Sequence, residues 1–349
     1  MRLKKALELK EHILGRYYKD IIGVSPRLRA QSEPPIERSE RRIAVGLAKL
    51  ESGYRVEIRI QRKGGAAQSM TNELKKKHGD DINVEVLENL EIPPISSIRQ
   101  LIQRKPLQMQ SRRPLEIGTS VGHVDGGPGT LGALVEYKGK DAVLSNAHVL
   151  APQGAAKKNP IFQPGREGSQ PPDADRIGEL SNWIHFSKTG ANTVDAAICL
   201  LDEIEDGAEL HSSNLIPDWC GAACRGRKIR GVQSALDMRL GTVLAKVGRT
   251  TGYTEGILTA ASMSDLTVKY HGIGNHRFDN AIEVTWDDLR QPFTRPGDSG
   301  SLVFDPRSMK AVGLHFAGGK IKRDGKKIGV SYACDIASVF SSLKCSLIL

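Results

Sequence analysis

The sequence is poor in cysteine and in aromatic residues, and it contains no long apolar segment. No run approaches the roughly 20 apolar residues that a membrane-spanning helix needs, so no membrane span is predicted. The first residues, MRLKKALELKEHILG, lack the apolar core and the small-residue cleavage site of a secretory signal. Aromatic residues make up only 5% of the chain, which argues against a surface that stacks nucleic-acid bases.

The five cysteines show no spacing typical of a disulfide framework. An odd count without a signal sequence favours free thiols in a reducing compartment, so we expect a cytoplasmic protein. Cys220 and Cys224 lie four residues apart, but the second cysteine pair or paired histidines of a zinc site do not follow. We therefore predict neither a metal nor a cofactor.

The composition is that of a globular protein, with 39% hydrophobic and 26% charged residues. The length of 349 residues suits about two domains. The net charge of +10 arises in residues 1–113, which hold 24 Lys and Arg against 14 Asp and Glu. Such an excess either attracts an acidic partner, such as nucleic acid or an anionic surface, or forms a solvated basic face. We favour the solvated face.

The amino-terminal third divides into helix, linker and a small folded region. Leucines and isoleucines near helical spacing predict a basic amphipathic helix over residues 1–20. A strand, strand, helix, strand order is then expected over Ile43–Lys49, Tyr54–Gln61, Met70–His78 and Ile82–Leu87. This order predicts a small α+β domain of about 50 residues between two proline-marked linkers.

From about Leu115 the pattern changes to short apolar runs between Gly, Asn and Asp turns, which predicts an all-β region. Strands are expected at Gly132–Tyr137, Ala142–Ser145, Thr193–Leu201, Gly241–Val247, Leu266–Tyr270, Ala281–Thr285, Ser301–Phe304, Ala311–Phe316 and Gly329–Cys334. A closing helix is expected over Ile336–Leu343. The G-x-G-x-x-G match at 127–132 precedes a strand rather than a helix, so we do not expect it to bind a nucleotide.

Three segments of the β-rich region supply a histidine, an aspartate and a serine. They are LSNAHVL with His148, NTVDAAI with Asp195 and RPGDSGSLV with Ser299, separated by 47 and 104 residues. Hydrolysis of an amide needs a nucleophile, a base that takes its proton, and a group that orients the base. These residue types meet that need. Asp173, Asp175 and Asp202 remain alternatives to Asp195.

The glycines around Ser299 add a second feature. Gly297 and Gly300 allow the backbone to turn sharply and expose the serine hydroxyl. The N–H groups of Gly297 and Ser299 can then converge on one point and form an oxyanion hole, each donor contributing about 3 kcal/mol. A plain glycine turn between strands is the alternative for this motif alone.

The LSNAHV and GDSGS segments, in His–Asp–Ser order, resemble the signatures of chymotrypsin-like (trypsin-fold) serine proteases over about residues 115–340. The resemblance implies a mainly β fold of two six-stranded antiparallel β-barrels, here preceded by the small α+β domain. It implies that Ser299 is the nucleophile, His148 the general base and Asp195 the residue that orients the imidazole. SVGH, GTLGALV and KVGRTTGYTEG resemble intracellular trypsin-like peptidases of bacteria, whose plant relatives include the narrow-leaf proteins and several of which carry an added N-terminal domain.

The resulting division of the chain has four parts. They are 1–42 (basic helix and linker), 43–113 (α+β domain and linker), 114–240 (first barrel and inter-barrel connection) and 241–349 (second barrel and closing helix). Ile43-Ala44-Val45-Gly46 looks like the activation site of secreted family members. It lies 105 residues before His148, more than twice the usual separation, so activation by cleavage there is not expected. Asp298 is then expected to cap its own loop.

The resemblance also points to the residues that select the substrate. The base of the specificity pocket falls on Phe293, so cleavage after Lys or Arg is not favoured. Thr294 and His315 look like the pair in glutamyl endopeptidases and viral 3C-type proteases, which implies Glu or Gln before the cut. The remaining wall is predicted to be Phe316, Ala317 and Gly318. Alternatively, His315 packs inside the barrel and Phe293 makes the pocket small and apolar.

These features predict a serine endopeptidase that acts on protein substrates. Because uncontrolled proteolysis harms a cell, we expect gating by the N-terminal region, a regulatory partner or a homo-oligomer. Two other functions stay open: a catalytically idle binding module with a protease fold, and a nucleic-acid or anionic-surface binder that uses the basic N-terminal domain. Nucleic acid is not the favoured partner.

Overall fold

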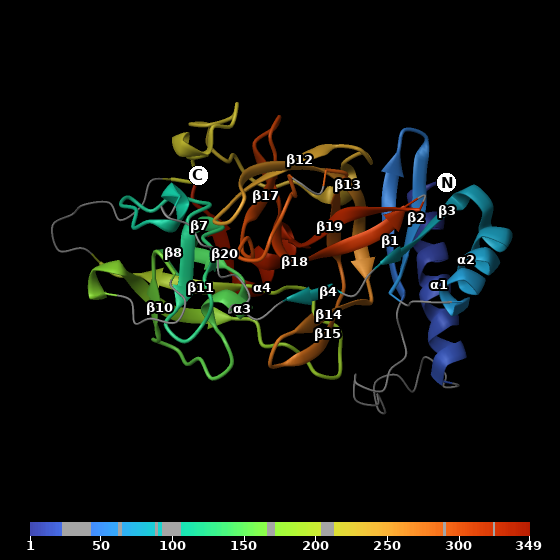
Figure 1. Ribbon diagram of the computed structural model, residues 1–349, viewed down its shortest axis with the longest axis horizontal. Helices are drawn as coiled ribbons and strands as arrows, with labels where there is room; N and C mark the ends of the chain where they lie inside the picture. The colour runs from blue at the N-terminus through green and yellow to red at the C-terminus, as the bar shows by residue number, and fades with distance from the viewer. Residues whose placement is uncertain are drawn as a thin grey trace.

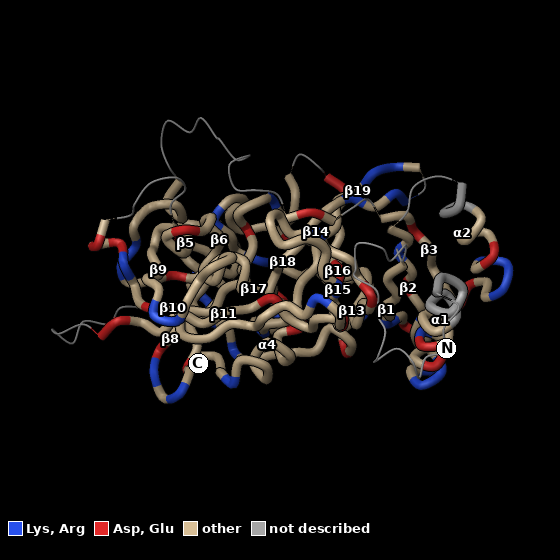
Figure 2. The backbone as a smooth tube through the Cα atoms, turned by 90° about the horizontal axis from the view of Figure 1, so that it is seen from below, with Lys and Arg blue, Asp and Glu red and all other residues tan. Residues whose placement is uncertain are grey.

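A computed structural model describes residues 1–22, 43–61, 65–87, 90–92, 106–165, 172–203, 213–288, 291–323 and 325–349 (Figure 1). The predicted first linker lies outside the described residues from 23 onward, as do residues 93–105 of the second. No helix among the described residues has both the length and the apolar character needed to cross a membrane. Figure 2 shows acidic and basic positions interspersed along the molecule, with a basic stretch at the end of α2.

The amino-terminal part is a three-stranded sheet covered by two helices. Its elements are α1 (Leu3–Ile22), β1 (Ile43–Leu50), β2 (Gly53–Ile60), α2 (Gly65–His78) and β3 (Ile82–Leu87). The first two strands form the predicted hairpin, and β3 runs parallel to β2. Both helices lie on the outer side of this sheet (Figure 1). Apolar side chains from α1, α2 and all three strands form one buried cluster, so the predicted α+β arrangement is confirmed.

The carboxyl-terminal half contains a closed barrel of six antiparallel strands. These are β12 (Val243–Gly248), β13 (Gly252–Ser264), β16 (Ala281–Trp286), β17 (Leu302–Asp305), β18 (Lys310–Arg323) and β19 (Lys326–Asp335). The ring closes because β18 pairs with β17 on one side and with β19 on the other. The closing helix α4 (Ile336–Leu343) has the predicted bounds, and the Asp335 side chain caps its first turn.

The other half is a curled antiparallel sheet of eight strands rather than six. In order of pairing it contains β20 (Cys345–Leu347), β7 (Ala133–Tyr137), β8 (Lys140–Ser145), β11 (Ala197–Leu201), β10 (Arg176–Trp183), β9 (Pro160–Phe162), β5 (Ser120–His123) and β6 (Gly129–Thr130). The two-residue β6 and the C-terminal β20 extend its two ends. The G-x-G-x-x-G segment contains β6 and leads into the strand β7 rather than into a helix, as predicted. The mainly β fold class is confirmed.

Shorter elements complete the chain. They are α3 (Ala147–Leu150), a small sheet of β14 (Leu266–Tyr270), β15 (Gly274–Phe278) and β4 (Leu90–Ile92), and 3₁₀ turns at Gly79–Asp81, Leu107–Met109, Asp173–Asp175, Asp218–Cys220 and Ala235–Asp237. The small sheet joins an antiparallel hairpin to β4, which runs parallel to β14. An N-terminal segment is thereby placed between β14 and the second barrel (Figure 1).

The N-terminal sheet is continuous with the second barrel. β3 pairs with β18 through Leu87 and Ile321, and β1 pairs with β13. The two layers also share a buried ion pair, in which the Arg59 guanidinium donates to both Glu283 carboxylate oxygens at 2.7 and 2.9 Å. Burial lowers the pKa of Arg59, but the carboxylates around it outweigh burial and raise that pKa well above the usual value. The boundaries at 42, 113 and 240 stay predictions.

Candidate active site

His148 and Asp195 are brought together by two paired strands. His148 lies in α3, directly after β8, and Asp195 lies in the loop before β11, which pairs with β8. The predicted strand Thr193–Leu201 begins only at Ala197, because the backbone groups of Asp195 bind side chains instead of a neighbouring strand. His148 Nδ1 lies 2.5 Å from Asp195 Oδ2, and the His148 N–H donates to Asp195 Oδ1 at 3.2 Å. The carboxylate thus contacts both the ring and the backbone of the histidine.

The three alternative aspartates lie elsewhere. Asp202 forms an ion pair with Arg176 at 2.9 Å, and Asp173 and Asp175 lie in a 3₁₀ turn. Of the four candidates, the structure brings Asp195 to the imidazole.

Asp195 is fully buried, and Tyr270 is the second side chain that contacts its carboxylate. The Tyr270 hydroxyl donates to Asp195 Oδ2 at 2.9 Å, and its ring meets the His148 ring edge-on at a centroid distance of 5.7 Å. Burial, followed by the charge of Asp195, raises the pKa of Tyr270 well above its usual value, so the phenol stays protonated as a donor. Tyr270 ends β14, and the register pairs it with Ile92 of β4.

Ser299 lies in the tight loop that precedes β17. Gly297 and Gly300 adopt φ values of +97° and +91°, a region that favours glycine. A Cβ atom at Gly300 would collide with the Ser145 hydroxyl. The glycines that the sequence places around the serine are therefore required by the backbone.

The backbone amides of this loop divide into two groups. Those of Asp298, Gly300 and Ser301 donate to carbonyl oxygens at 2.9–3.0 Å. In the part of the chain that the structure describes, the amides of Gly297 and Ser299 have no acceptor. The two N–H groups predicted to form the oxyanion hole are thus available to a bound oxygen atom.

The buried Asp298 side chain fixes the position of the loop that carries Ser299. Its carboxylate accepts hydrogen bonds from the N–H groups of Thr250 and Arg295 at 2.9 Å and from the Thr251 hydroxyl at 2.7 Å, and it lies 3.5 Å from Lys246 Nζ. Asp298 and Lys246 are both fully buried. Burial raises the pKa of Asp298, but Lys246 and these donors outweigh it and lower that pKa below the usual value.

The remote Ile43 has no part in this arrangement. It begins β1, is buried there, and pairs with Ile60. The cation beside Asp298 is a lysine side chain from β12.

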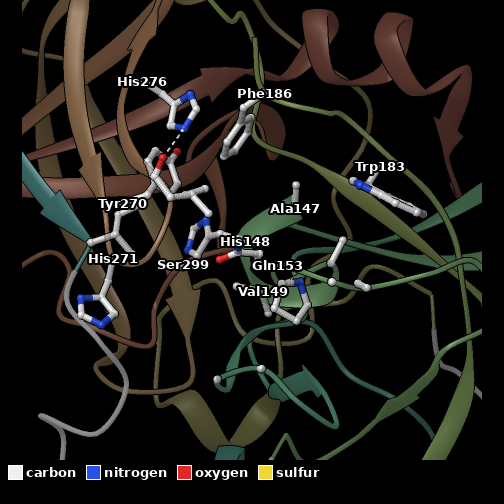
Figure 3. A pocket seen from close by; sticks show the side chains of 18 of the residues that line it. Ala147, His148, Val149, Gln153, Trp183, Phe186, Tyr270, His271, His276 and Ser299 are labelled. Carbon is white, nitrogen blue, oxygen red and sulfur yellow. Dashed lines mark hydrogen bonds between the residues drawn. The ribbon is translucent and has the colours of Figure 1, made fainter. Parts of the chain in front are cut away.

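Two cavities meet at Ser299. The first, of about 560 Å³, is lined by His148 together with aromatic side chains of Trp183, Phe186 and Tyr270. In Figure 3 His148, Tyr270 and Ser299 gather at one side of this cavity and Trp183 lies at the other.

The second cavity, of about 330 Å³, contains most of the predicted specificity residues, namely Thr294, His315, Phe316, Ala317 and Gly318. Ser299, Pro296 and Ile92 line both cavities. Phe293 is not among the residues that line either cavity. It is fully buried in a separate apolar cluster, where its ring packs 6.2 Å from that of Trp286.

His315 is a buried, neutral imidazole at the wall of the second cavity. Burial lowers its pKa to about 4, so it carries no charge at neutral pH. Ser331 Oγ lies 2.8 Å from Nδ1 and the Tyr332 carbonyl lies 3.2 Å away. When the Ser331 hydroxyl donates to Nδ1, the Nε2–H is left as a hydrogen-bond donor.

No protein-family model and no curated protein matches the sequence. Similar solved structures include a Nocardiopsis protease, 15% identical with a TM-score of 0.45 over 67% of this chain and 98% of that chain. A chymotrypsin of Cellulomonas bogoriensis is 16% identical, with a TM-score of 0.44 over 67% and 97% of the two chains. A glutamic-acid-specific serine protease, described as using a histidine triad in substrate binding, is 18% identical, with a TM-score of 0.44 over 67% and 100%.

Three parts of the site were not found from the sequence: Tyr270, Lys246 and Ile92. Tyr270 lies on the buried face of a strand that was predicted, so its burial could have been inferred but its partner could not.

All five cysteines are free, and among the residues described no three His, Cys, Asp or Glu side chains gather as metal ligands.

Proposed function

We propose that this protein is a serine peptidase that cleaves peptide bonds within protein substrates through an acyl-enzyme on Ser299. The observation that carries the proposal is the 2.5 Å contact between His148 Nδ1 and Asp195 Oδ2, made at the wall of the cavity that also contains Ser299.

In the first step Ser299 Oγ bonds to the carbonyl carbon of the scissile bond, and its proton passes to His148 Nε2. Asp195 accepts the hydrogen bond from Nδ1–H and stabilises the imidazolium that forms. The N–H groups of Gly297 and Ser299 donate to the carbonyl oxygen as it becomes an oxyanion. His148 then gives its proton to the leaving amine as the C–N bond breaks. In the second step His148 takes a proton from a water molecule, which attacks the ester carbonyl. His148 then gives this proton to Ser299 Oγ as the C–O bond breaks.

The proposal extends to the residue before the cut. Thr294 and His315 supply a hydroxyl and an imidazole at the second cavity, and these groups can satisfy a Glu or Gln side chain that an apolar pocket would leave unpaired. The alternative is a small apolar residue.

The test is labelling of the full chain with a fluorophosphonate, which reacts only with an activated serine. Folded protein is expected to be labelled at Ser299, with no labelling of Ser299→Ala or of heat-denatured protein. Strong loss in His148→Ala is expected as well. If folded wild-type protein is not labelled, the chain is better described as a catalytically idle binding module. Retention of Ser299→Ala on DNA that weakens steeply as the salt concentration rises would favour the nucleic-acid alternative instead.

A further inference from the structure

One edge of β18 is left unpaired beside Ser299. On one side β18 pairs with β19 from Gly313 to Arg323, with one register shift at Phe316. On the other it pairs with β17 as far as Leu314 and with β3 from Ile321 onward. Of the six positions between them, His315 bonds the backbone of Gly300 and Ser301. On this side, no strand within the described residues pairs with the other five, Phe316–Lys320, and all five line the second cavity. An unpaired edge of this kind accepts an extended peptide as an additional strand.

The two ends of this edge differ. At its start lies the nucleophile loop, because the His315 N–H donates to the Ser301 carbonyl and the His315 carbonyl accepts from the Gly300 N–H. At its far end lies β3, whose last residue, Leu87, is paired with Ile321 and is buried. The edge is therefore open toward Ser299 and closed by the N-terminal sheet.

The direction of a bound peptide follows from the pairing of β18. All partners of β18 run antiparallel to it. A peptide that pairs in the same sense has its carboxyl end at Phe316, beside Ser299, and its amino end facing Leu87. Its chain would continue the line of β3, so both cannot occupy the positions opposite Ile321 and beyond.

The length of the gap sets the number of residues that fit. Five strand positions at about 3.3 Å per residue accommodate about four peptide residues before the closing strand is reached. β4 forms the opposite wall, where Glu91 and Ile92 line the same cavity and Glu91 is held by Lys269 at 2.9 Å. The N-terminal part thus limits this side of the groove from two directions.

We infer that the groove takes at most about four residues on the acyl side of the cut, so that the enzyme removes short segments from the amino termini of polypeptides. This inference rests on the proposed function for the cleavage step, but the groove itself can be tested without catalysis. β3 and β4 act as a stop for the amino-terminal segment of the substrate.

The first experiment measures binding to full-length Ser299→Ala. The fluorescent peptides have one, four or eight residues on the acyl side of the cut. In each peptide, the residue directly before the cut is the one that a cleavage library selects. Affinity is expected to rise about tenfold from one to four acyl-side residues, as main-chain hydrogen bonds form, and to fall about tenfold from four to eight. Equal or tighter binding of the eight-residue form would overturn the inference. With the same peptides, wild-type protein should show the same order in kcat/KM. Binding without turnover would refute the proposed function and leave the groove intact.

A second measurement locates the amino end of the peptide. A photoreactive benzoylphenylalanine at the first of four acyl-side residues should crosslink within residues 82–87 or 90–92. Crosslinks to the loops around Asp125 or Gln153, which line only the first cavity, would reverse the direction and overturn the inference.

Ile92→Arg should weaken binding of the four-residue form about tenfold. The matched Ile273→Arg, which changes a residue of the first cavity only, should alter it less than about twofold. Equal effects of the two substitutions would also contradict the inference.

Discussion

Tyr270 and His148 share one oxygen atom of Asp195. The phenol donates to Oδ2 at 2.9 Å and the imidazole Nδ1 lies 2.5 Å from the same atom. Tyr270 ends a strand whose partner is β4 of the N-terminal segment. The carboxylate that orients the proposed base is therefore held by a hairpin inserted between two barrel strands, and this hairpin is itself covered by the N-terminal part.

Tyr270→Phe should lower kcat about tenfold and leave KM nearly unchanged, because the hydroxyl contacts Asp195 and not the peptide groove. Steady-state kinetics on a cleaved peptide would measure this split. Tyr253→Phe is a suitable control, since its hydroxyl bonds Glu255 outside the triad. A rise in KM with unchanged kcat would show that Tyr270 serves substrate binding instead.

Lys246→Met should destabilise the fold by about 3–5 kcal/mol, because it leaves the Asp298 carboxylate buried without its cation. Fluorophosphonate labelling of Ser299 should fall as well, since Asp298 holds the loop that carries the two amide donors. Urea denaturation gives the change in stability. Combining the substitution with Asp298→Asn should recover part of the lost stability. If the double variant is as unstable as Lys246→Met alone, the buried charge of Asp298 is not the cause of the loss.

Stability should decrease as pH falls from about 6.5 to about 4. The pKa of His315 is about 4 in the folded protein against an ordinary 6.5, because burial disfavours the charged ring. Between these values the unfolded chain binds a proton that the folded chain does not, which lowers stability by about 3 kcal/mol over the window. Urea denaturation at several pH values measures the slope. His315→Gln should lose this contribution, and an equal slope in that variant would disprove it.

Thr294→Val should reduce kcat/KM for peptides with Glu or Gln before the cut by about tenfold, because a buried polar side chain would lose its partner. Peptides with Ala at that position should be affected little. A wild-type cleavage profile dominated by Arg, Lys or Leu would rule out this specificity without touching the proposed triad.

Arg59→Met should cost about 3–5 kcal/mol of stability, since Glu283 would be buried without its bidentate partner. Arg239→Met, at an exposed ion pair 3.9 Å from Glu51, is the control and should be nearly neutral. If both substitutions are equally mild by denaturation, the N-terminal sheet is not tied to the second barrel by this ion pair.

Local patterns alone predicted a large part of the fold. The bounds of Ile82–Leu87, Leu266–Tyr270 and Ile336–Leu343 coincide with those observed, because each segment has a simple apolar period and a clear end. β13 was missed. Its pairing with β16 contains two register shifts, so its burial does not alternate and no period of two marks it in the sequence.

The residue types at 148, 195 and 299, and the glycines that the serine loop requires, were determined by the sequence, because each lies in a short segment whose chemistry is local. Only the tertiary structure decided what surrounds them. The hydroxyl on Asp195 comes from 75 residues away, and the wall of the groove comes from β4, far upstream of the barrels. Such contacts depend on which strands pair, and strand pairing is settled by packing across the whole molecule rather than by any one segment.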